Sequence, residues 1–587
     1  MDYLPVPPLA QTLQKYLAAV SPLLSPLERQ RTEQAVVRTL EGDGPACQAE
    51  LEAFAETENA QGRSWLSAAW SRGYLAVRTP LPLTSNVGFQ IRVPAGSVAE
   101  SAQPVADGNV RAAAVIHRLA AAHLAWLRGE LPPEHTPRRQ SVCGVQREVL
   151  AGGLRHPAAN VDHVRSASQH PARREIGLLL DDRFLAVPIS DERGQPLPAE
   201  ALERAIDAAL DLAAPSESRP VPGFTALSYL GSEAASAYLD RLLHDPDNAR
   251  VYERLTQALF VVNLVRTPAD MRDHLMRTAF LPGQAWAYTS ITYQIGLADD
   301  FVGMHLEHSR VDAATLKAVL EQAQQGHWLA EPGLASNEGA LIEPLEWKLP
   351  DDLADDLTRE ITAYRAQAEQ LRLDTVRVPR PVPADLPFRI SDDALCQWVM
   401  LYAQLATFGR VRSTYEAVDL RHYQAGRTEC LRSVTPEAVT LVKALIAGRV
   451  QAAHLPDALS AHKDWIKMCK TGQGIDRHLT GLALMATATD RSLLVLEDAG
   501  WSRLTTDFLS TSSIGDHEQI VGMAFAPTSR GGIGINYTPL GEDYEFLVSS
   551  HRTQTSDIET FIAQLREGAD ALAALLAGMV EVPSAPA

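Results

Sequence analysis

Three side chains in the second half of the chain, Tyr415, Thr428 and Arg477, are of the types that together hold a small carboxylate. Tyrosine and threonine each supply a hydroxyl donor, and arginine supplies a permanently charged guanidinium with two parallel donors. Tyr415 and Thr428 lie in one segment, YEAVDLRHYQAGRTECLRS, and Arg477 lies in a second, DRHL. Together these residues favour a carboxylate-bearing substrate. The alternative is a turn braced by a salt bridge, which is the commoner explanation for each residue taken singly.

A histidine and an aspartate, His308 and Asp312, are placed for acid–base chemistry where an apolar segment gives way to a loop. Imidazole has an ordinary pKa near neutrality, which suits it to act as a general base. No other His-x-x-x-Asp pair occurs in the sequence. The pair predicts a proton-transfer element. The alternative is a surface histidine beside an aspartate that caps or braces the loop.

Ser510 and Ser512 belong to a hydroxyl cluster, LSTSS, that follows an apolar stretch. A hydroxyl held at the end of a strand can donate to the oxyanion that forms during acyl transfer. Clusters of serine and threonine are also common in turns and caps. The sequence contains no Gly-x-Ser-x-Gly segment, so we do not expect a serine nucleophile of the hydrolase type.

The elements that must position these residues alternate between helices and strands along the chain. Helical spacing of apolar residues marks 109–131 and 555–579, whereas 504–512 and 520–526 are typical of strands. The proline-rich stretch 375–390 has the composition that best fits a linker. A chain of 587 residues is too long for one ordinary core. We therefore expect an α/β protein with two or more domains.

Charge and cysteine usage exclude several functions. The formal net charge is −19, which argues against nucleic-acid binding and against general attachment to anionic membranes. The five cysteines include no Cys-x-x-Cys pair, so we expect neither a metal site nor a disulfide framework. The first residues lack the apolar core of a signal peptide, and no apolar run reaches about 18 residues. These features predict a cytoplasmic protein without a membrane span.

Four ordered blocks of the sequence resemble the choline/carnitine O-acyltransferase family. The opening LPVPPLAQTLQKYL resembles the start of the family, and the segment from Glu307 to Asp312 is similar to its catalytic segment. YEAVDLRHYQAGRTECLRS with DRHLTGL forms the third block, and LSTSSI forms the fourth. The resemblance runs nearly end to end. It implies an enzyme that moves an acyl group between a thioester and a hydroxyl acceptor.

The resemblance implies roles for the catalytic residues. His308 would act as the general base on the acceptor hydroxyl or, in reverse, on the thiol, without an acyl-enzyme. Asp312 would position and polarise the imidazole. Ser512 would donate to the oxyanion of the tetrahedral intermediate, and Ser510 would line the same pocket. No cofactor and no metal is implied, because coenzyme A is a substrate in this family.

The same comparison implies the binding residues. Tyr415, Thr428 and Arg477 would bind the carboxylate of carnitine, in agreement with the carboxylate site inferred from the residue types. Choline has no carboxylate, so the complete set favours carnitine as the acceptor. Asp393 and Glu416 match family positions that face the pantetheine arm of coenzyme A.

The fold that the resemblance implies has two domains of similar architecture. Each would be a mixed β-sheet flanked by helices, as in chloramphenicol acetyltransferase, with an active-site tunnel at the interface. Residues 85–350 would form the domain that carries the catalytic histidine. Residues 1–84 and 351–587 would form a discontinuous second domain that binds the acceptor and the pantetheine.

The chain departs from the family where the 3′-phosphate of coenzyme A would bind. The family places lysines before a helix that begins Ser-Pro-Asp-Ala, whereas this chain reads Ser-Asp-Asp-Ala from Ser391. It has no lysine between Lys348 and Lys443, although Arg380 and Arg389 lie nearby and could replace the missing charge. Two donors therefore stay open: an acyl group on coenzyme A, or one on the phosphopantetheine of an acyl carrier protein.

Acyl-chain length is inferred from one position. Met523 falls close to a family position where a bulky side chain shortens the acyl tunnel, so we expect a short or medium acyl chain. The favoured function is acyl transfer between coenzyme A and carnitine. The alternatives are transfer from a carrier protein or to another hydroxylated acceptor in a biosynthetic pathway, and a non-catalytic family member that only binds ligands.

Overall fold

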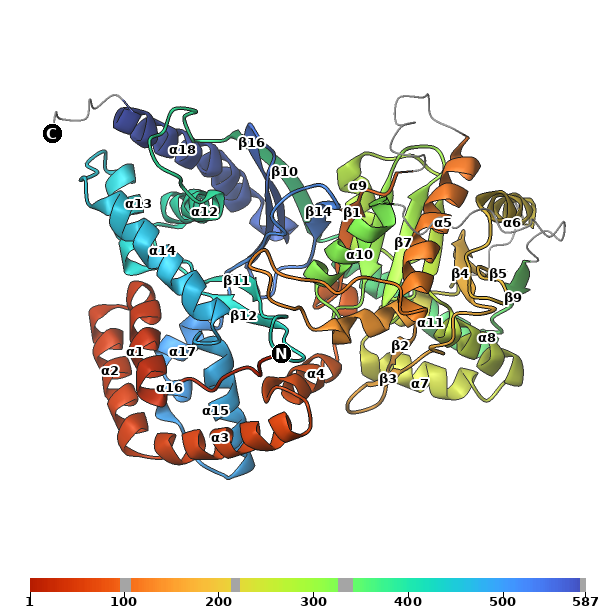
Figure 1. Cartoon of the computed structure of the whole chain (residues 1–587), viewed down its shortest axis with the longest axis horizontal. Helices are drawn as coiled ribbons and strands as arrows, with labels where there is room; N and C mark the ends of the chain where they lie inside the picture. Colours follow the sequence, from red (N-terminus) through yellow and green to blue (C-terminus); the bar gives the residue numbers. More distant parts are fainter. Residues whose placement is uncertain (95–106, 213–221, 326–341, 581–587) are drawn as a thin grey trace.

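Two mixed β-sheets, each flanked by helices, make up the computed structural model, which describes residues 1–94, 107–212, 222–325 and 342–580 (Figure 1). In these residues the first sheet has the strand order β14-β1-β8-β7-β6-β4-β5-β9, and the second has the order β10-β16-β15-β13-β11-β12. The predicted α/β fold with two mixed sheets is therefore confirmed.

The strands fall into three groups. The first sheet contains β1 Val87–Ile91, β4 Glu175–Leu180, β5 Arg183–Pro188, β6 Val261–Val265, β7 Ile291–Gly296, β8 Val302–Leu306, β9 Glu343–Leu345 and β14 Ile520–Ala524. The second contains β10 Leu371–Pro379, β11 Thr414–Asp419, β12 Thr428–Leu431, β13 Leu509–Ser512, β15 Ile533–Pro539 and β16 Asp543–His551. A separate hairpin contains β2 Leu154–His156 and β3 His163–Arg165.

The helices flank both sheets. Those before residue 300 are α1 Leu9–Val20, α2 Pro26–Glu41, α3 Gly44–Ala60, α4 Leu66–Leu75, α5 Gly108–Leu127, α6 Ala199–Leu212, α7 Ser232–Leu242, α8 Pro246–Gln257 and α9 Met271–Phe280. Those after it are α10 Ala313–Gln325, α11 Asp351–Ala368, α12 Asp392–Phe408, α13 Pro436–Ile446, α14 His454–Lys470, α15 Asp476–Ala488, α16 Leu494–Glu497, α17 Ala499–Leu504 and α18 Thr555–Val580.

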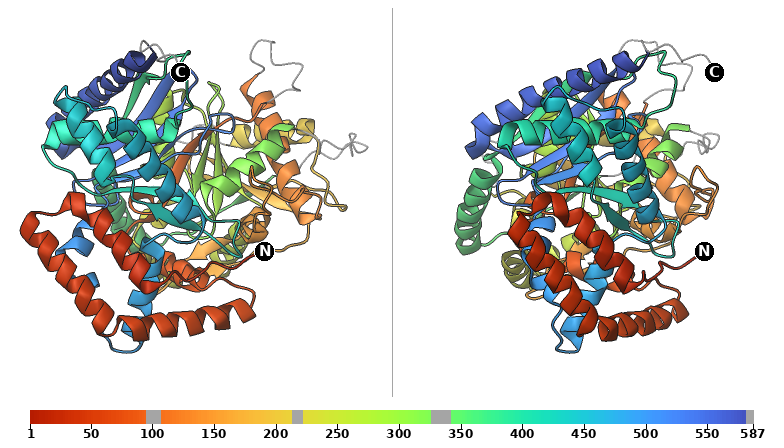
Figure 2. Two further views of the ribbon diagram at one scale, coloured as in Figure 1. Left: turned by 60° about the vertical axis from the view of Figure 1, so that its left-hand side comes forward. Right: turned by 90° about the vertical axis from the view of Figure 1, so that its left-hand side faces the viewer.

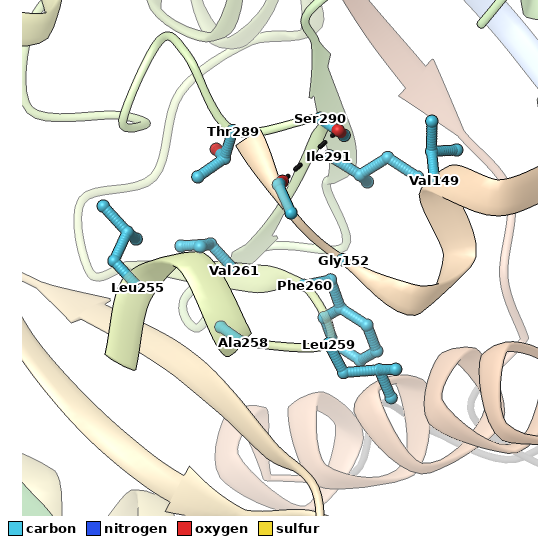
Figure 3. Close-up of a pocket in the computed structure, with 11 residues that line it drawn as sticks. Val149, Gly152, Leu255, Ala258, Leu259, Phe260, Val261, Thr289, Ser290 and Ile291 are labelled. Carbon is cyan, nitrogen blue, oxygen red and sulfur yellow. Dashed lines mark hydrogen bonds between the residues drawn. The ribbon is translucent and has the colours of Figure 1, made fainter. Parts of the chain in front are cut away.

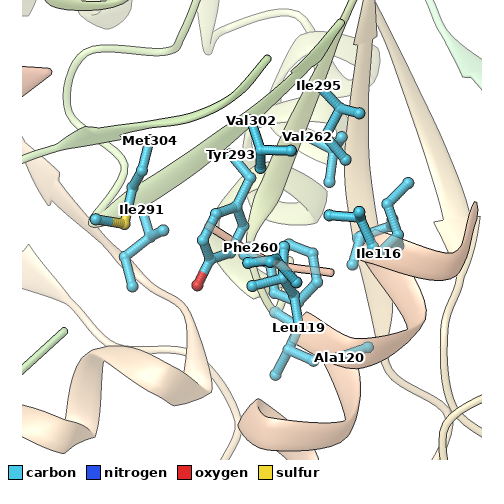
Figure 4. Close-up of a cluster of buried hydrophobic side chains, with 14 of the residues drawn as sticks. Ile116, Leu119, Ala120, Phe260, Val262, Ile291, Tyr293, Ile295, Val302 and Met304 are labelled. Atoms are coloured by element: carbon cyan, nitrogen blue, oxygen red, sulfur yellow. The ribbon is translucent and has the colours of Figure 1, made fainter. Parts of the chain in front are cut away.

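Helix α5 forms the main support of the first sheet. Its Ile116 and Leu119 lie in a buried cluster with Val262 of β6 and Tyr293 of β7 (Figure 4). The ring of His123, also on α5, lies with Nε2 2.9 Å from the Tyr293 hydroxyl. Close packing of this kind makes a rigid layer. The layer supports β7 and β8, and the functional loop at 307–312 follows β8 directly.

Helices α12 and α18 support the second sheet. Val399 of α12 and Phe561 and Leu565 of α18 share a buried cluster with Phe546 of β16. The predicted helix at 555–579 matches α18 to within one residue. Ser391 caps α12 by accepting a hydrogen bond from the backbone N–H of Ala394, which fixes where this helix begins.

Helices α1, α2 and α3 pack against α15, α16 and α17 of the second half of the chain (Figures 1 and 2). Leu13 of α1 and Leu51 of α3 are buried in one cluster with Leu479 and Leu482 of α15. Strand β14 connects the halves in the other direction. It follows β13 of the second sheet in sequence, but it pairs with β1 of the first sheet, with Met523 opposite Phe89. The two halves are thus linked by secondary structure as well as by side-chain contacts.

The prediction of a linker at 375–390 is wrong for residues 375–379, which belong to a strand. Strand β10 runs through Pro379 and pairs with β16 along its whole length. Only 380–391 connects this strand to α12. Within the described residues, no helix is both long enough and apolar enough to cross a membrane.

Candidate active site

His308 lies directly after β8, with its imidazole held in one tautomer. Its Nδ1 lies 2.7 Å from the carbonyl oxygen of Val311, and a carbonyl can only accept. Nδ1 therefore carries the proton and Nε2 keeps the lone pair. The ring lies edge-on to Tyr74 of α4, with the ring centres 5.5 Å apart. Burial is the main cause that lowers the pKa of His308, so the ring is neutral at pH 7.

Asp312 and Arg427 form a buried ion pair that braces the loop of His308. The Arg427 Nε lies 2.8 Å from Asp312 Oδ2 and its Nη2 lies 2.9 Å from Oδ1. The same guanidinium donates to the carbonyls of Ser309 and His308 at 2.6 and 2.8 Å, and Gln146 donates to Asp312 at 2.8 Å. Asp312 is 3.9 Å from the His308 Nδ1. The hydrogen bond that orients the imidazole thus comes from the backbone, and Asp312 acts through its charge and by bracing the loop.

The residue before the histidine is fixed by a second buried network. Glu307 is fully buried and accepts from the Ser309 hydroxyl at 2.5 Å. Arg155 lies 3.4 Å from Glu307 and 2.7 Å from Asp162, which also binds Arg78 at 2.7 Å. A buried charge is stable only when it is paired. This chain of alternating charges therefore holds the start of the loop of His308 in place.

Arg477, Thr428 and Tyr415 come together as the sequence predicts. Arg477 lies in the first turn of α15, and its Nε donates to the Thr428 carbonyl at 2.8 Å, while Nη2 is 3.5 Å from the Thr428 hydroxyl. The guanidinium carbon lies 4.3 Å from the ring centre of Trp70. Burial raises the pKa of Tyr415, so its phenol keeps its proton and remains a donor, and Arg477 is the main charge acting on it.

Glu429 lies beneath Arg477 as a buried counter-charge. Its Oε1 accepts from the backbone N–H of Cys430 at 2.7 Å and lies 4.0 Å from the Arg477 Nε. Burial raises the pKa of Glu429 to about 7, although Arg477 acts to lower it. The net charge beside Arg477 therefore changes near neutral pH.

Ser510 and Ser512 lie on β13, next to the strand that carries Tyr415. Ser510 pairs in register with Tyr415, and Ser512 is the last residue of the strand. Asn536 of β15 donates to the Ser512 carbonyl at 3.1 Å and accepts from the backbone N–H of Met523 at 3.2 Å. Met523 itself is only 4% exposed within the core of the first sheet. Asn536 thus joins the serine strand to β14 of the other sheet.

Glu416 and Asp393 form a buried polar network. The Tyr537 hydroxyl donates to Asp393 at 2.6 Å and also contacts Glu416. Gln397 donates to Glu416 at 2.9 Å, and His462 Nε2 lies 2.8 Å from Asp393. Burial is the main cause that raises the pKa of Glu416 well above its ordinary value. Burial therefore disfavours the charged form of Glu416, whose carboxyl oxygens are hydrogen-bonded by Gln397 and Tyr537.

The two arginines before α12 differ in availability. Arg380 donates from Nε and Nη2 to the two carboxylate oxygens of Asp392, at 2.8 and 3.2 Å. The Tyr544 hydroxyl contacts the same carboxylate at 2.5 Å. Arg389 is exposed on the connecting segment. Of the two cations that could replace the missing lysines, Arg380 is committed to a carboxylate of the protein.

A small cavity behind the catalytic loop is too small to be a substrate site. It lies between Gly153 and the start of β7, where the Ser290 hydroxyl donates to the Gly153 carbonyl at 3.3 Å (Figure 3). Its volume of about 10 Å³ is that of a single water at most. It is a packing defect of the first sheet rather than a binding site.

Four residues of the site were missed by sequence reasoning. Trp70 and Tyr74 come from α4, and Arg427 and Glu429 flank Thr428. Arg427 and Glu429 could have been found, because they lie directly on either side of Thr428, which the sequence predicts to be a carboxylate-binding residue. Trp70 and Tyr74 are four residues apart on one helix, but nothing in this spacing says that the helix packs against His308 and Arg477.

Known proteins resemble this chain over most of its length. The Choline/Carnitine o-acyltransferase family model matches residues 4–567. The carnitine O-acetyltransferase of Columba livia is 25% identical over 94% of this chain and 89% of its own, and the muscle isoform of human carnitine O-palmitoyltransferase 1 is 26% identical over 94% and 74%. The solved trichothecene 15-O-acetyltransferase of Fusarium sporotrichioides is 10% identical, with 86% of this chain and 94% of that chain covered and a TM-score of 0.42. The chain belongs to the choline/carnitine O-acyltransferase family and is an O-acyltransferase.

Proposed function

We propose that the protein transfers a short- or medium-chain acyl group between coenzyme A and carnitine, with His308 as the general base. The observation that carries this proposal is the tautomer of His308: the Val311 carbonyl fixes the proton on Nδ1 and leaves a lone pair on Nε2. The carboxylate-binding set around Arg477 lies on the same side, since Tyr74 contacts His308 and Trp70 of the same helix contacts Arg477.

In the proposed reaction, Nε2 takes the proton of the carnitine hydroxyl as its oxygen attacks the thioester carbonyl. The negative charge that develops on the carbonyl oxygen receives a hydrogen bond from the Ser512 hydroxyl. Collapse of the intermediate breaks the carbon–sulfur bond, and the imidazolium returns the proton to the leaving thiolate. Arg477, Tyr415 and Thr428 hold the acceptor carboxylate throughout. No covalent acyl-enzyme is required.

The proposal is tested by replacing the base. His308→Ala should lower kcat by about 10²- to 10⁴-fold, measured as release of free thiol from acetyl- or octanoyl-coenzyme A in the presence of carnitine. The matched control is His244→Ala, which removes an exposed histidine in the turn after α7 and should leave the rate unchanged. Unchanged turnover in His308→Ala would reject the proposed base.

A second candidate donor is an acyl carrier protein. It is favoured by the pairing of Arg380 with Asp392 and by the absence of lysine between Lys348 and Lys443. Thiol release from an acyl carrier protein, but not from acyl-coenzyme A, would support this donor. Efficient release from acyl-coenzyme A would reject it.

A further inference from the structure

A second, cationic cavity lies beside the second sheet, away from the residues described so far. Its volume is about 190 Å³, and it is lined by four arginines, Arg410, Arg412, Arg503 and Arg530, around Ser413 and Phe508. The whole chain carries a net charge of −19, so a cavity lined by four guanidinium groups is a local positive region on an acidic protein. Such a concentration of one sign focuses the local field on anions.

The cavity is formed where three parallel strands begin. Strands β11, β13 and β15 are parallel neighbours, and Arg410–Ser413, Thr506–Phe508 and Arg530 lie just before them. Ser512 is the last residue of β13, about 13 Å from Phe508 at about 3.3 Å per residue. The cavity therefore opens at the end of the sheet opposite to Ser512 and is separate from the proposed active site.

The cavity arginines are only partly neutralised. Arg503 contacts Glu28 at 2.5 Å, and Asp557 acts electrostatically on Arg412. Arg410 and Arg530 are exposed, and neither has an ion pair with a described residue. At least two full positive charges thus remain available to a ligand.

Arg412 is held in position before any ligand binds. Its guanidinium carbon lies 3.9 Å from the ring centre of Phe508 and 5.0 Å from that of Phe408. Its Nε is buried and has no acceptor among the described residues. The Ser413 hydroxyl, by contrast, already donates to the Leu504 carbonyl and accepts from Arg432. Recognition in the cavity therefore depends on guanidinium groups rather than on the hydroxyl.

We propose that this cavity binds a compact anion carrying two or more phosphate charges, as in a diphosphate group. Guanidinium groups bind phosphate through two parallel hydrogen bonds, which makes arginine the usual residue for this purpose. The volume is below the range of about 300–1,000 Å³ that is typical of sites for whole drug-sized ligands. The cavity therefore suits a phosphate-bearing group better than a bulky organic molecule.

The proposal is tested by calorimetric titration of the full chain with pyrophosphate at low ionic strength, with saturating coenzyme A present to fill the donor site. We expect one pyrophosphate per chain. The double variant Arg410→Gln/Arg530→Gln should weaken binding at least tenfold, and Arg530→Glu alone should weaken it further than Arg530→Gln. The control Arg204→Gln removes an exposed arginine from α6, in the other half of the molecule, and should bind as the native chain does.

Absence of pyrophosphate binding, or an unchanged affinity in the double variant, would overturn the proposal. Binding to anionic vesicles or to an acidic peptide without binding to pyrophosphate would also overturn it, because the ligand would then be a surface or a protein. The variants are expected to keep the native melting temperature and the native rate of acyl transfer. The calorimetric titration does not measure acyl transfer, so its result tests the cavity proposal separately from the proposed function.

Discussion

Arg477 on the proposed acceptor side and Arg380 on the proposed donor side are the same residue type with opposite hydrogen-bonding arrangements. The Arg477 Nε donates to the backbone carbonyl of Thr428, and the guanidinium stacks on Trp70. The carboxylate oxygen of Glu429 is 4.0 Å from this Nε. Arg380 directs both Nε and Nη2 at Asp392. Most of the hydrogen-bonding capacity of Arg477 thus stays available to a ligand, whereas one whole edge of Arg380 is used by the protein.

This difference shows that a motif position is informative only together with its partners. An arginine in a carboxylate-binding segment predicts a ligand site when no carboxylate of the protein lies in bidentate contact with it. Arg427, one residue before Thr428, is the opposite case, since Asp312 binds it fully. The proposed acceptor side therefore combines one ion pair, Arg427 with Asp312, that braces the loop of His308 with one arginine, Arg477, that has no carboxylate in bidentate contact.

The largest effect is expected when the ion pair between Arg427 and Asp312 is broken. Arg427→Gln leaves the Asp312 carboxylate buried without its partner, which should cost about 3–5 kcal/mol of unfolding free energy. Urea denaturation followed by circular dichroism measures this loss. The double variant Arg427→Gln/Asp312→Asn removes both charges and should regain most of the stability. A single variant as stable as the native chain would show that the pair does not brace the loop.

Removing Arg477 should affect binding more than stability, because the pKa of Glu429 is raised to about 7 and its carboxyl can become neutral. Arg477→Ala should raise the KM for carnitine by about 10- to 150-fold, because hydrogen bonds to a charged partner contribute about 1.5–3 kcal/mol. Steady-state kinetics at saturating acetyl-coenzyme A gives this value. Choline, which has no carboxylate, serves as the control acceptor, and its KM should be the same in the variant and the native enzyme. An unaffected KM for carnitine would mean that this site does not bind the acceptor.

The proposed acceptor residues could be named from the sequence because their chemistry is local. Tyr415 and Thr428 lie in one segment, and the residue types alone indicate a carboxylate ligand. Trp70 could not be placed in the same way, because its contact with Arg477 depends on how the N-terminal helices pack against α15. Likewise, the hydrogen bond from His308 to the Val311 carbonyl depends on loop geometry that no sequence pattern encodes.

The donor side was less predictable for a different reason. The prolines of 375–390 suggested a linker, yet β10 occupies the residues up to Pro379 as the edge strand of its sheet. Proline is tolerated at an edge and at the end of a strand, because the missing N–H is not needed by a second neighbour. The side chains at Leu373, Val376 and Val378 are buried, so burial by the sheet outweighs composition here.

A smaller effect is expected from pH on the acceptor side. Because the pKa of Glu429 is raised to about 7, its carboxyl is neutral below that pH and becomes charged as the pH rises through it. The new negative charge lies beside Arg477 and competes with the acceptor carboxylate, so the KM for carnitine should rise by about fivefold between pH 6 and pH 8. Glu429→Gln should flatten this dependence. A KM that falls over this interval in the native enzyme would contradict the assignment.

The smallest effect is expected on the proposed donor side, where removing the carboxylate partner of Arg380 would free its guanidinium for a ligand. Asp392→Asn removes the carboxylate charge that binds this arginine but keeps the size of the side chain. Both partners are about one-third exposed, so the freed charge should lower the KM for acetyl-coenzyme A by only about two- to fourfold. Acetyl-dephospho-coenzyme A lacks the 3′-phosphate, and its KM should stay constant. Arg380→Gln in the Asp392→Asn background should remove the gain. If the KM for both donors falls equally, the freed arginine does not recognise the phosphate, and the donor side gains no phosphate contact from this residue.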